Sequence, residues 1–216
     1  MGDLVYRIDD RLYVNLTNRC TNDCTFCIRR SGPGVAGAGL WLEREPPAEE
    51  YIRAIPDPDR YAEIVFCGYG EPLLRPDVLE AVARDIRARS QTPIRVNTNG
   101  QAELALRRDI LSGLVGLVDT FSISLNAQDN ATYRALCRPA FGDRAYPAVL
   151  EFARRAARLF PRVVLTVVDV PGVDVEACRR IAESLGVEFR VREHLDSGDR
   201  YLEGPAGRSP EAEERS

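Results

Sequence analysis

Strand patterns alternate with helix patterns along most of this chain, and that alternation limits its fold more than any other feature. Apolar residues recur at helical spacing in five stretches, and a sixth helix is expected after Gly100. Strands separated by helices usually pair in parallel. The predicted helices cover residues 46–55, 78–89, 132–137, 148–160 and 175–185; the predicted strands cover residues 12–17, 63–67, 94–98, 118–126, 163–169 and 187–192.

The length of the chain decides how these units close. An eight-fold barrel usually needs about 250 residues, whereas this chain has 216. We therefore expect an α/β fold in which six units form an open, TIM-like partial (β/α)6 barrel of parallel strands. Residues 203–216 contain only Glu, Gly, Pro, Ala, Arg and Ser, so they are predicted to be a disordered tail behind a single domain, residues 1–202.

Three of the predicted strands have one polar face, which is unusual for strands covered by helices. Side chains of alternate residues share a face. If the apolar faces meet the helices, the polar faces line a binding cavity; the alternative is a set of edge strands with one wet face. The residues on these polar faces are Asn97 and Asn99; Ser122, Ser124 and Asn126; and Glu188, Arg190 and Arg192.

Composition excludes several classes of function. All 29 cationic residues are Arg, so there is no lysine for a P-loop, a Schiff base or pyridoxal phosphate. The single histidine, His194, excludes multi-histidine metal centres. The net charge of −4 does not favour nucleic acid or membranes. No apolar run resembles a signal peptide or a membrane span, so the protein is expected in the reducing cytoplasm.

Three cysteines, Cys20, Cys24 and Cys27, follow the first predicted strand with the spacing C-x3-C-x2-C. Three thiolates on one loop can converge on one metal centre. A structural zinc site usually takes four ligands, and a 4Fe–4S cluster with three cysteines keeps one iron open. The alternative is a zinc loop completed by a remote cysteine. Cys178 and Cys67 are interpreted as core residues, and Cys137 is left open.

A second loop, Phe66–Leu73, reads FCGYGEPL and follows the second predicted strand. Its glycines let backbone approach a ligand closely. Together with the cysteine loop, it resembles the radical S-adenosylmethionine (SAM) superfamily. The resemblance implies that Cys20, Cys24 and Cys27 hold a catalytic 4Fe–4S cluster and that the second loop contacts SAM. Phe26 fits the superfamily pattern, whereas Tyr69 stands where many members have glycine.

Further segments extend the resemblance over residues 4–195. Residues 97–100, NTNG, resemble a DTNG segment of glycyl-radical-enzyme activases, with Asn97 in place of aspartate. Asn126 stands where those activases have a SAM-contacting lysine, residues 168–174 resemble their VVPG loop, and His194 stands where they place a histidine near SAM. The combined motifs are most similar to the TatD-nuclease-associated radical SAM proteins. The expected cofactor-binding residues are Phe26, Gly68, Tyr69, Gly70, Glu71, Pro72, Asn97, Asn99, Ser124, Asn126 and His194.

The resemblance implies a specific chemistry. One electron from the reduced cluster would cleave SAM to a 5′-deoxyadenosyl radical, which would abstract hydrogen from a substrate. The electron donor would be a flavodoxin or ferredoxin. Three hypotheses follow: an enzyme acting on a small molecule or nucleotide; an activase or modifier of a protein or nucleic-acid partner linked to a TatD-type nuclease; and a non-catalytic metal-binding module. Arg190 and Arg192 are candidates to hold an anionic substrate or the SAM carboxylate.

Overall fold

The computed structural model describes residues 2–30, 32 and 34–194. Its main sheet has seven strands in the order β1-β2-β5-β6-β7-β8-β9. The last six are parallel, as predicted, while β1 pairs antiparallel with β2. The strands are β1 (Val5–Ile8), β2 (Arg11–Val14), β5 (Glu63–Phe66), β6 (Ile94–Thr98), β7 (Thr120–Ser124), β8 (Arg162–Val168) and β9 (Glu188–Arg192).

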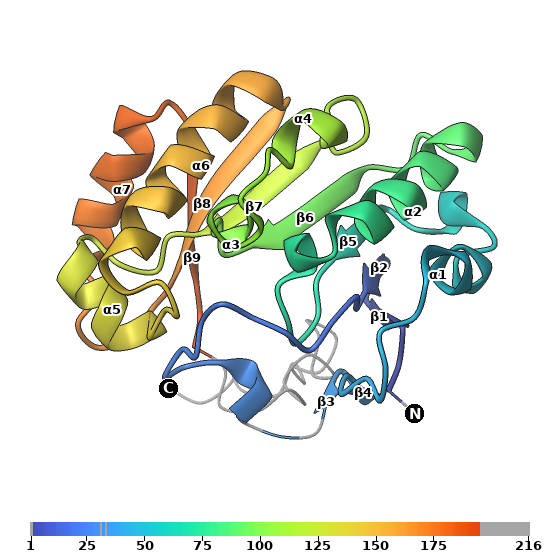
Figure 1. The fold of residues 1–216 in the computed structure, drawn as a ribbon, viewed down its shortest axis with the longest axis horizontal. Helices are drawn as coiled ribbons and strands as arrows, with labels where there is room; N and C mark the ends of the chain where they lie inside the picture. Colours follow the sequence, from blue (N-terminus) through green and yellow to red (C-terminus); the bar gives the residue numbers. More distant parts are fainter. Residues whose placement is uncertain (1, 31, 33, 195–216) are drawn as a thin grey trace, which may run out of the picture.

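The helices cover the outer side of this sheet in an arc (Figure 1). All of the predicted helices are present, and the stretch after Gly100 holds two short ones. They are α1 (Ala48–Ala54), α2 (Pro76–Arg89), α3 (Ala102–Leu106), α4 (Leu111–Leu114), α5 (Asn130–Cys137), α6 (Ala145–Leu159) and α7 (Val175–Ser184). A small hairpin, β3 (Gly34–Val35) with β4 (Ala38–Gly39), lies in the glycine-rich stretch. Short 3-10 turns occupy Ile28–Arg30, Pro58–Arg60, Pro72–Leu74 and Gly142–Arg144.

The hydrophobic core lies between the helices and the outward faces of the strands. Phe121 on β7 packs edge-on against Phe152 of α6, with ring centroids 5.8 Å apart, and against Phe160, at 4.6 Å. All three rings are buried. Burying each side chain of this size contributes roughly 1.5–3 kcal/mol, so this contact anchors α6 to the centre of the sheet.

The inward faces of the strands carry the polar residues, as the alternation predicts. Asn97 lies beside Ser122 in the register of β6 and β7, and Thr166 lies beside Arg190 in β8 and β9. Within the described residues, β1 and β9 each have one neighbouring strand, so the sheet is an open arc. The strands with polar faces therefore form the inner wall of a partial barrel and are not edge strands with one solvent-exposed face.

Two sequence-based expectations concern the ends of the chain and the membrane. The predicted tail, residues 203–216, and the end of the predicted domain at residue 202 lie outside the described residues. In the part of the chain that the structure describes, no helix combines the length and the apolar character needed to cross a bilayer.

Candidate active site

A cavity of about 860 Å³ occupies the concave side of the sheet. It is lined by the inner faces of the strands and by the loops that leave their carboxyl ends, which is where ligands bind in open α/β sheets. All three cysteines of the loop line it, as does every expected cofactor-binding residue except Pro72. The sequence-based site therefore comes together in one place, and the individual roles of these residues stay predictions.

The cysteine loop is fixed from two sides. After β2 it crosses below the sheet toward α5 (Figure 1), where Asn22 and Pro139 form an antiparallel bridge. The side chain of Asn22 is buried; it donates to the hydroxyl of Tyr133 at 2.9 Å and accepts from Gln101 at 2.8 Å. Since all three groups are buried, breaking this network would leave buried polar atoms without hydrogen-bond partners, at a cost of about 1–3 kcal/mol each.

The thiols of the loop are half-buried and face the same cavity. The Cys20 sulfur accepts from the backbone N–H of Asn22 at 3.4 Å and from the amide of Asn99 at 3.6 Å. Burial raises the pKa of Cys20 to about 11. A hydrogen bond with the thiol of Cys137 raises the pKa of Cys24 far above its usual range.

This donor set fits an iron–sulfur cluster. Three cysteines of one loop supply only sulfur, the ligand such clusters use, and N–H groups point at one of the sulfurs, which is a usual way to stabilise a bound thiolate. Among the described residues, no three His, Cys, Asp or Glu side chains are arranged around a single metal ion.

The glycine loop packs directly on the start of the cysteine loop. A Cβ at Gly70 would stand 2.5 Å from the carbonyl oxygen of Arg19 and closer still to that of Thr17. A Cβ at Gly68 would collide with the side chain of Asn15, whose amide is held by the carbonyl of Leu40 at 2.8 Å. Both positions therefore require glycine for steric reasons.

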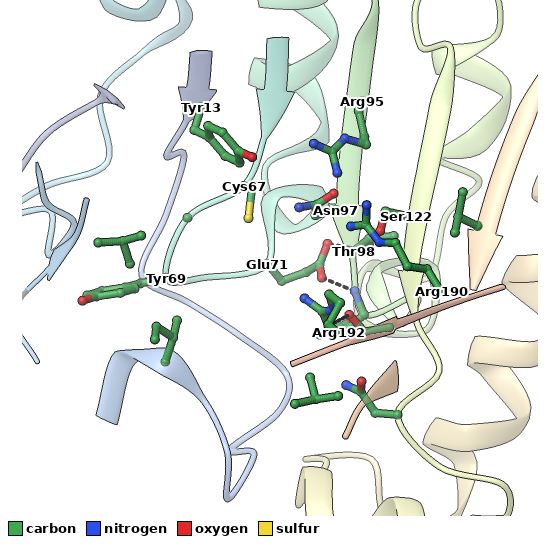
Figure 2. A pocket seen from close by; sticks show the side chains of 18 of the residues that line it. Tyr13, Cys67, Tyr69, Glu71, Arg95, Asn97, Thr98, Ser122, Arg190 and Arg192 are labelled. Atoms are coloured by element: carbon green, nitrogen blue, oxygen red, sulfur yellow. Dashed lines mark hydrogen bonds between the residues drawn. The ribbon is translucent and has the colours of Figure 1, made fainter. Parts of the chain in front are cut away.

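Tyr69, between these glycines, is tolerated because its side chain points away from Cys67 and Glu71 (Figure 2). The ring is buried and lies edge-on to Trp41, with centroids 5.1 Å apart. Its hydroxyl donates to the carbonyl of Gly32 at 3.0 Å. The departure from the common glycine thus gives the loop an additional anchor on the segment that follows Cys27.

Glu71 ties the glycine loop to the NTNG turn. Its buried carboxylate accepts from the backbone N–H groups of Leu73 at 3.0 Å and Asn99 at 2.6 Å, and from the hydroxyl of Thr98 at 2.8 Å. Burial raises the pKa of Glu71 to about 7, although these hydrogen bonds lower it. Because the amide of Asn99 in turn reaches Cys20, Glu71 positions a group beside the cysteine loop.

Two asparagine side chains at the cavity have buried oxygen atoms that are unsatisfied. The side-chain oxygens of Asn97 and Asn126 have no hydrogen-bond partner among the described residues. Asn126 follows β7 with φ of 56°, a left-handed conformation that asparagine tolerates better than most residues. An unpaired buried acceptor costs about 1–3 kcal/mol, so both oxygens are suited to accept from a bound ligand.

The other cysteines divide between cavity and core. Cys178 is fully buried in the core, as predicted, and Cys137 is fully buried as well. The interpretation of Cys67 as a core residue is wrong: its side chain lines the cavity beside Asn97 (Figure 2). Cys67 follows Phe66, which faces the helices, so its side chain points to the opposite face.

Arginines line the cavity from its floor to its rim. Arg95 pairs with Glu63 at 2.9 Å, with both side chains mostly buried, and Arg162 pairs with Glu188 at 2.7 Å. Arg11 also approaches Glu63, at 3.4 Å. Arg190 and Arg192 face the cavity, as the alternation of β9 predicts. Sequence reasoning missed the first three because a charged residue at a strand start usually faces solvent.

Tyr6 and Tyr13 were also missed as cavity-lining residues. They stack with ring centroids 5.1 Å apart, and the hydroxyl of Tyr6 donates to the carbonyl of Cys67 at 3.2 Å. The signal for Tyr13 was present, since it alternates with Leu12 and Val14, which face the core. β1, which carries Tyr6, was not predicted at all.

The chain is similar in sequence to one known family and to several curated proteins. The sequence model described as "Radical SAM superfamily" matches residues 14–185. GTP 3′,8-cyclase 2 of Mycobacterium tuberculosis is 32% identical over 214 residues, covering 91% of this chain and 54% of the relative. GTP 3′,8-cyclase of Streptomyces coelicolor is 30% identical over 198 residues, covering 88% and 54%. The chain therefore spans about half the length of these relatives.

Solved structures show the same fold at low identity. Streptococcus suis SuiB bound to S-adenosylmethionine superposes with a TM-score of 0.64 at 14% identity, over 86% of this chain and 41% of SuiB. Native anSMEcpe with bound AdoMet also gives 0.64, at 13% identity, over 85% and 52%. At these identities the likeness concerns the fold alone.

Proposed function

Because this chain belongs to the radical SAM superfamily, we propose that Cys20, Cys24 and Cys27 hold its 4Fe–4S cluster and that residues 68–72 position SAM beside it. The protein is a radical SAM enzyme, and its cofactors are the cluster and the SAM that this superfamily uses. When bound and reduced, the cluster supplies the electron that cleaves SAM to a 5′-deoxyadenosyl radical.

The other predicted contacts surround the same space. The unpaired oxygens of Asn97 and Asn126 would accept hydrogen bonds from the hydroxyl or amino groups of SAM. Ser124, at the end of β7, offers a hydroxyl, and Arg192 donates to it at 3.4 Å. Asn99 is held by Glu71, while Phe26 and His194 line the wall nearby. In this proposal the chain orients SAM and excludes water, and needs no general base.

The proposed substrate is a nucleotide. Arg190 carries this proposal: it faces the cavity from β9 (Figure 2), and it has no ion-pair partner within the described residues. A cation so placed is available to a substrate phosphate, and Arg binds phosphate with two parallel hydrogen bonds. The printed names of the relatives, GTP 3′,8-cyclases, point to the same ligand class.

The experiment measures 5′-deoxyadenosine by mass spectrometry. The anaerobically reconstituted protein receives SAM and dithionite, with GTP, ATP, or no nucleotide. We expect Cys24→Ala to abolish 5′-deoxyadenosine, Cys178→Ala to leave it unchanged, and a nucleotide to increase it and to be consumed. Full 5′-deoxyadenosine formation by Cys24→Ala would refute the cluster assignment. If 5′-deoxyadenosine formed equally fast with GTP, with ATP and without a nucleotide, the substrate assignment would be refuted.

A second candidate is a macromolecular substrate, as in an activase or a modifier associated with a TatD-type nuclease. The open arc between β1 and β9 supports it, because a barrel without a closing strand admits a large partner. The test adds the nuclease of the same organism to the assay. A rise in 5′-deoxyadenosine without any nucleotide favours this candidate. Flavodoxin and ferredoxin, the proposed electron donors, replace dithionite in a parallel series.

A further inference from the structure

The loop that carries the three cysteines lies antiparallel to the end of α5, and the register places Cys24 opposite Cys137. The bridge joins Asn22 to Pro139, so two residues further along each segment stand Cys24 and Cys137. The backbone N–H of Thr25 donates to the carbonyl of Leu136 at 2.9 Å, which continues the same register. Opposed residues in antiparallel pairs have Cα atoms about 4.5–5.5 Å apart, within the range of about 4.4–6.8 Å that disulfides use.

Side chains agree with the backbone. The thiol of Cys137 is the largest influence on the pKa of Cys24, which it raises, so the two side chains lie close together. Cys137 is fully buried, whereas Cys24 lines the cavity. A small oxidant in the cavity can therefore reach Cys24, whereas the buried Cys137 is not open to the cavity. Cys178, equally buried on α7, lies on another helix of the core and provides a matched control.

We propose that Cys24 and Cys137 form a reversible disulfide when the protein without its cluster meets a peroxide. The Cys24 thiol first gives up its proton, and peroxide oxygen then adds to the thiolate sulfur; the proton joins the departing hydroxide, so the products are a sulfenic acid and one water. The Cys137 sulfur then displaces the hydroxyl group, which leaves as a second water. In total two S–H bonds and one O–O bond break, and one S–S bond and two O–H bonds form; each sulfur loses one electron, and hydrogen peroxide gains two.

The disulfide removes one of three cluster ligands, so it blocks reassembly of the cluster until a dithiol reduces it. This consequence rests on the proposed role of Cys24 as a ligand. The pair also limits damage, because a disulfide is reversible whereas the higher oxidation states of cysteine are mostly not. Cys137 thereby acquires a function in addition to its place in the core.

Peptide mapping tests the bond directly. Cluster-free protein is treated with hydrogen peroxide, its free thiols are alkylated, and trypsin releases residues 20–29 and 135–144. We expect these two peptides to be linked, with fragment ions placing the bond at Cys24, and dithiothreitol to separate them. Cys137→Ala and Cys137→Ser, checked by circular dichroism for folding, should both lose the link, while Cys178→Ala retains it. A link within residues 20–29, or Cys137 fully alkylated, would overturn the proposal.

Iron uptake tests the consequence. Peroxide-treated wild type should bind several-fold less iron on anaerobic reconstitution, and dithiothreitol should restore it. Cys137→Ala should lose less iron uptake on the same treatment; an equal loss would show that this disulfide is not what blocks the site. Cys24→Ser without peroxide separates the two proposals, since full cluster content in that variant refutes the ligand role of Cys24 and leaves the peptide map unaffected.

Discussion

The carboxylate of Glu71 accepts the backbone N–H of Asn99 at 2.6 Å, and this contact joins the two loops proposed to hold SAM. The same carboxylate accepts from Thr98, and Asn99 reaches Cys20. Glu71 therefore acts on the site by positioning its neighbours, because its own oxygens are occupied by protein donors.

Stability should fall as the pH rises through the range in which Glu71 ionises. Burial raises the pKa of its carboxyl from 4.5 to about 7, so the folded state favours the neutral acid. The stability gained is complete below about pH 4.5 and is lost as the pH approaches 7. At about 1.4 kcal/mol for each pH unit of separation, the loss is about 3 kcal/mol.

Urea unfolding of the cluster-free protein at several pH values measures this effect. Glu71→Gln cannot ionise, so the difference between wild type and this variant isolates the contribution. Glu49→Gln, exposed on α1, is the control and should follow wild type. A wild type that becomes more stable relative to Glu71→Gln above pH 6 would contradict the direction.

Gly70→Ala should displace the glycine loop. The new methyl group would meet the carbonyl oxygens of Thr17 and Arg19, which are backbone atoms and cannot swing aside. We expect a loss of roughly 1–3 kcal/mol in unfolding free energy, together with weaker SAM binding by calorimetry. Gly39→Ala is the matched control because its Cβ would meet nothing within 4 Å. Equal effects of the two substitutions would argue against the steric role.

Tyr69→Phe should separate the hydrogen bond of this residue from its packing. Loss of the bond to the carbonyl of Gly32 is expected to cost about 1 kcal/mol, while the edge contact with Trp41 persists. Tyr69→Ala removes both and should cost about 3–5 kcal/mol, the range for large aromatic side chains. The fluorescence of Trp41, the single tryptophan, reports the contact and should change only in Tyr69→Ala.

Arg190→Gln should weaken nucleotide binding. A hydrogen bond to a charged group contributes about 1.5–3 kcal/mol, which corresponds to roughly a ten- to hundredfold rise in Kd. Equilibrium binding of GTP to the reconstituted protein measures it. Arg107→Gln, at an exposed helix end, serves as control. Unchanged affinity in Arg190→Gln would exclude this residue from the nucleotide site.

Periodicity in the sequence was sufficient for the parallel strands. β6 has the predicted bounds because Ile94, Val96 and Thr98 alternate with polar residues and are buried. β7 ends at Ser124, before the predicted end at Asn126. The alternation of polar and apolar residues continues to Asn126, but the backbone becomes left-handed at that residue. Side-chain spacing carries no information on such a backbone change. β1, with only four residues at the edge, was too short for its pattern to be distinguished from a loop.

The candidate site could be predicted where it depends on an unusual spacing of reactive residues. It could not be predicted where it depends on contacts between segments that are distant in the sequence. Three closely spaced cysteines point to a metal centre in any fold. Glu71, by contrast, belongs to a recognisable motif, but its link to Asn99 joins residues 28 positions apart. The pairing of Cys24 with Cys137 depends on the antiparallel register after α5, which no local pattern in the sequence reveals.

The ion pairs at the starts of the strands have a consequence for molecules that meet this cavity. Glu63 between Arg11 and Arg95, and Arg162 with Glu188, form its floor. An apolar molecule bound there would displace water from these charged groups without offering them hydrogen bonds, which costs free energy. The cavity therefore disfavours apolar compounds, and a molecule that binds there needs polar groups of its own.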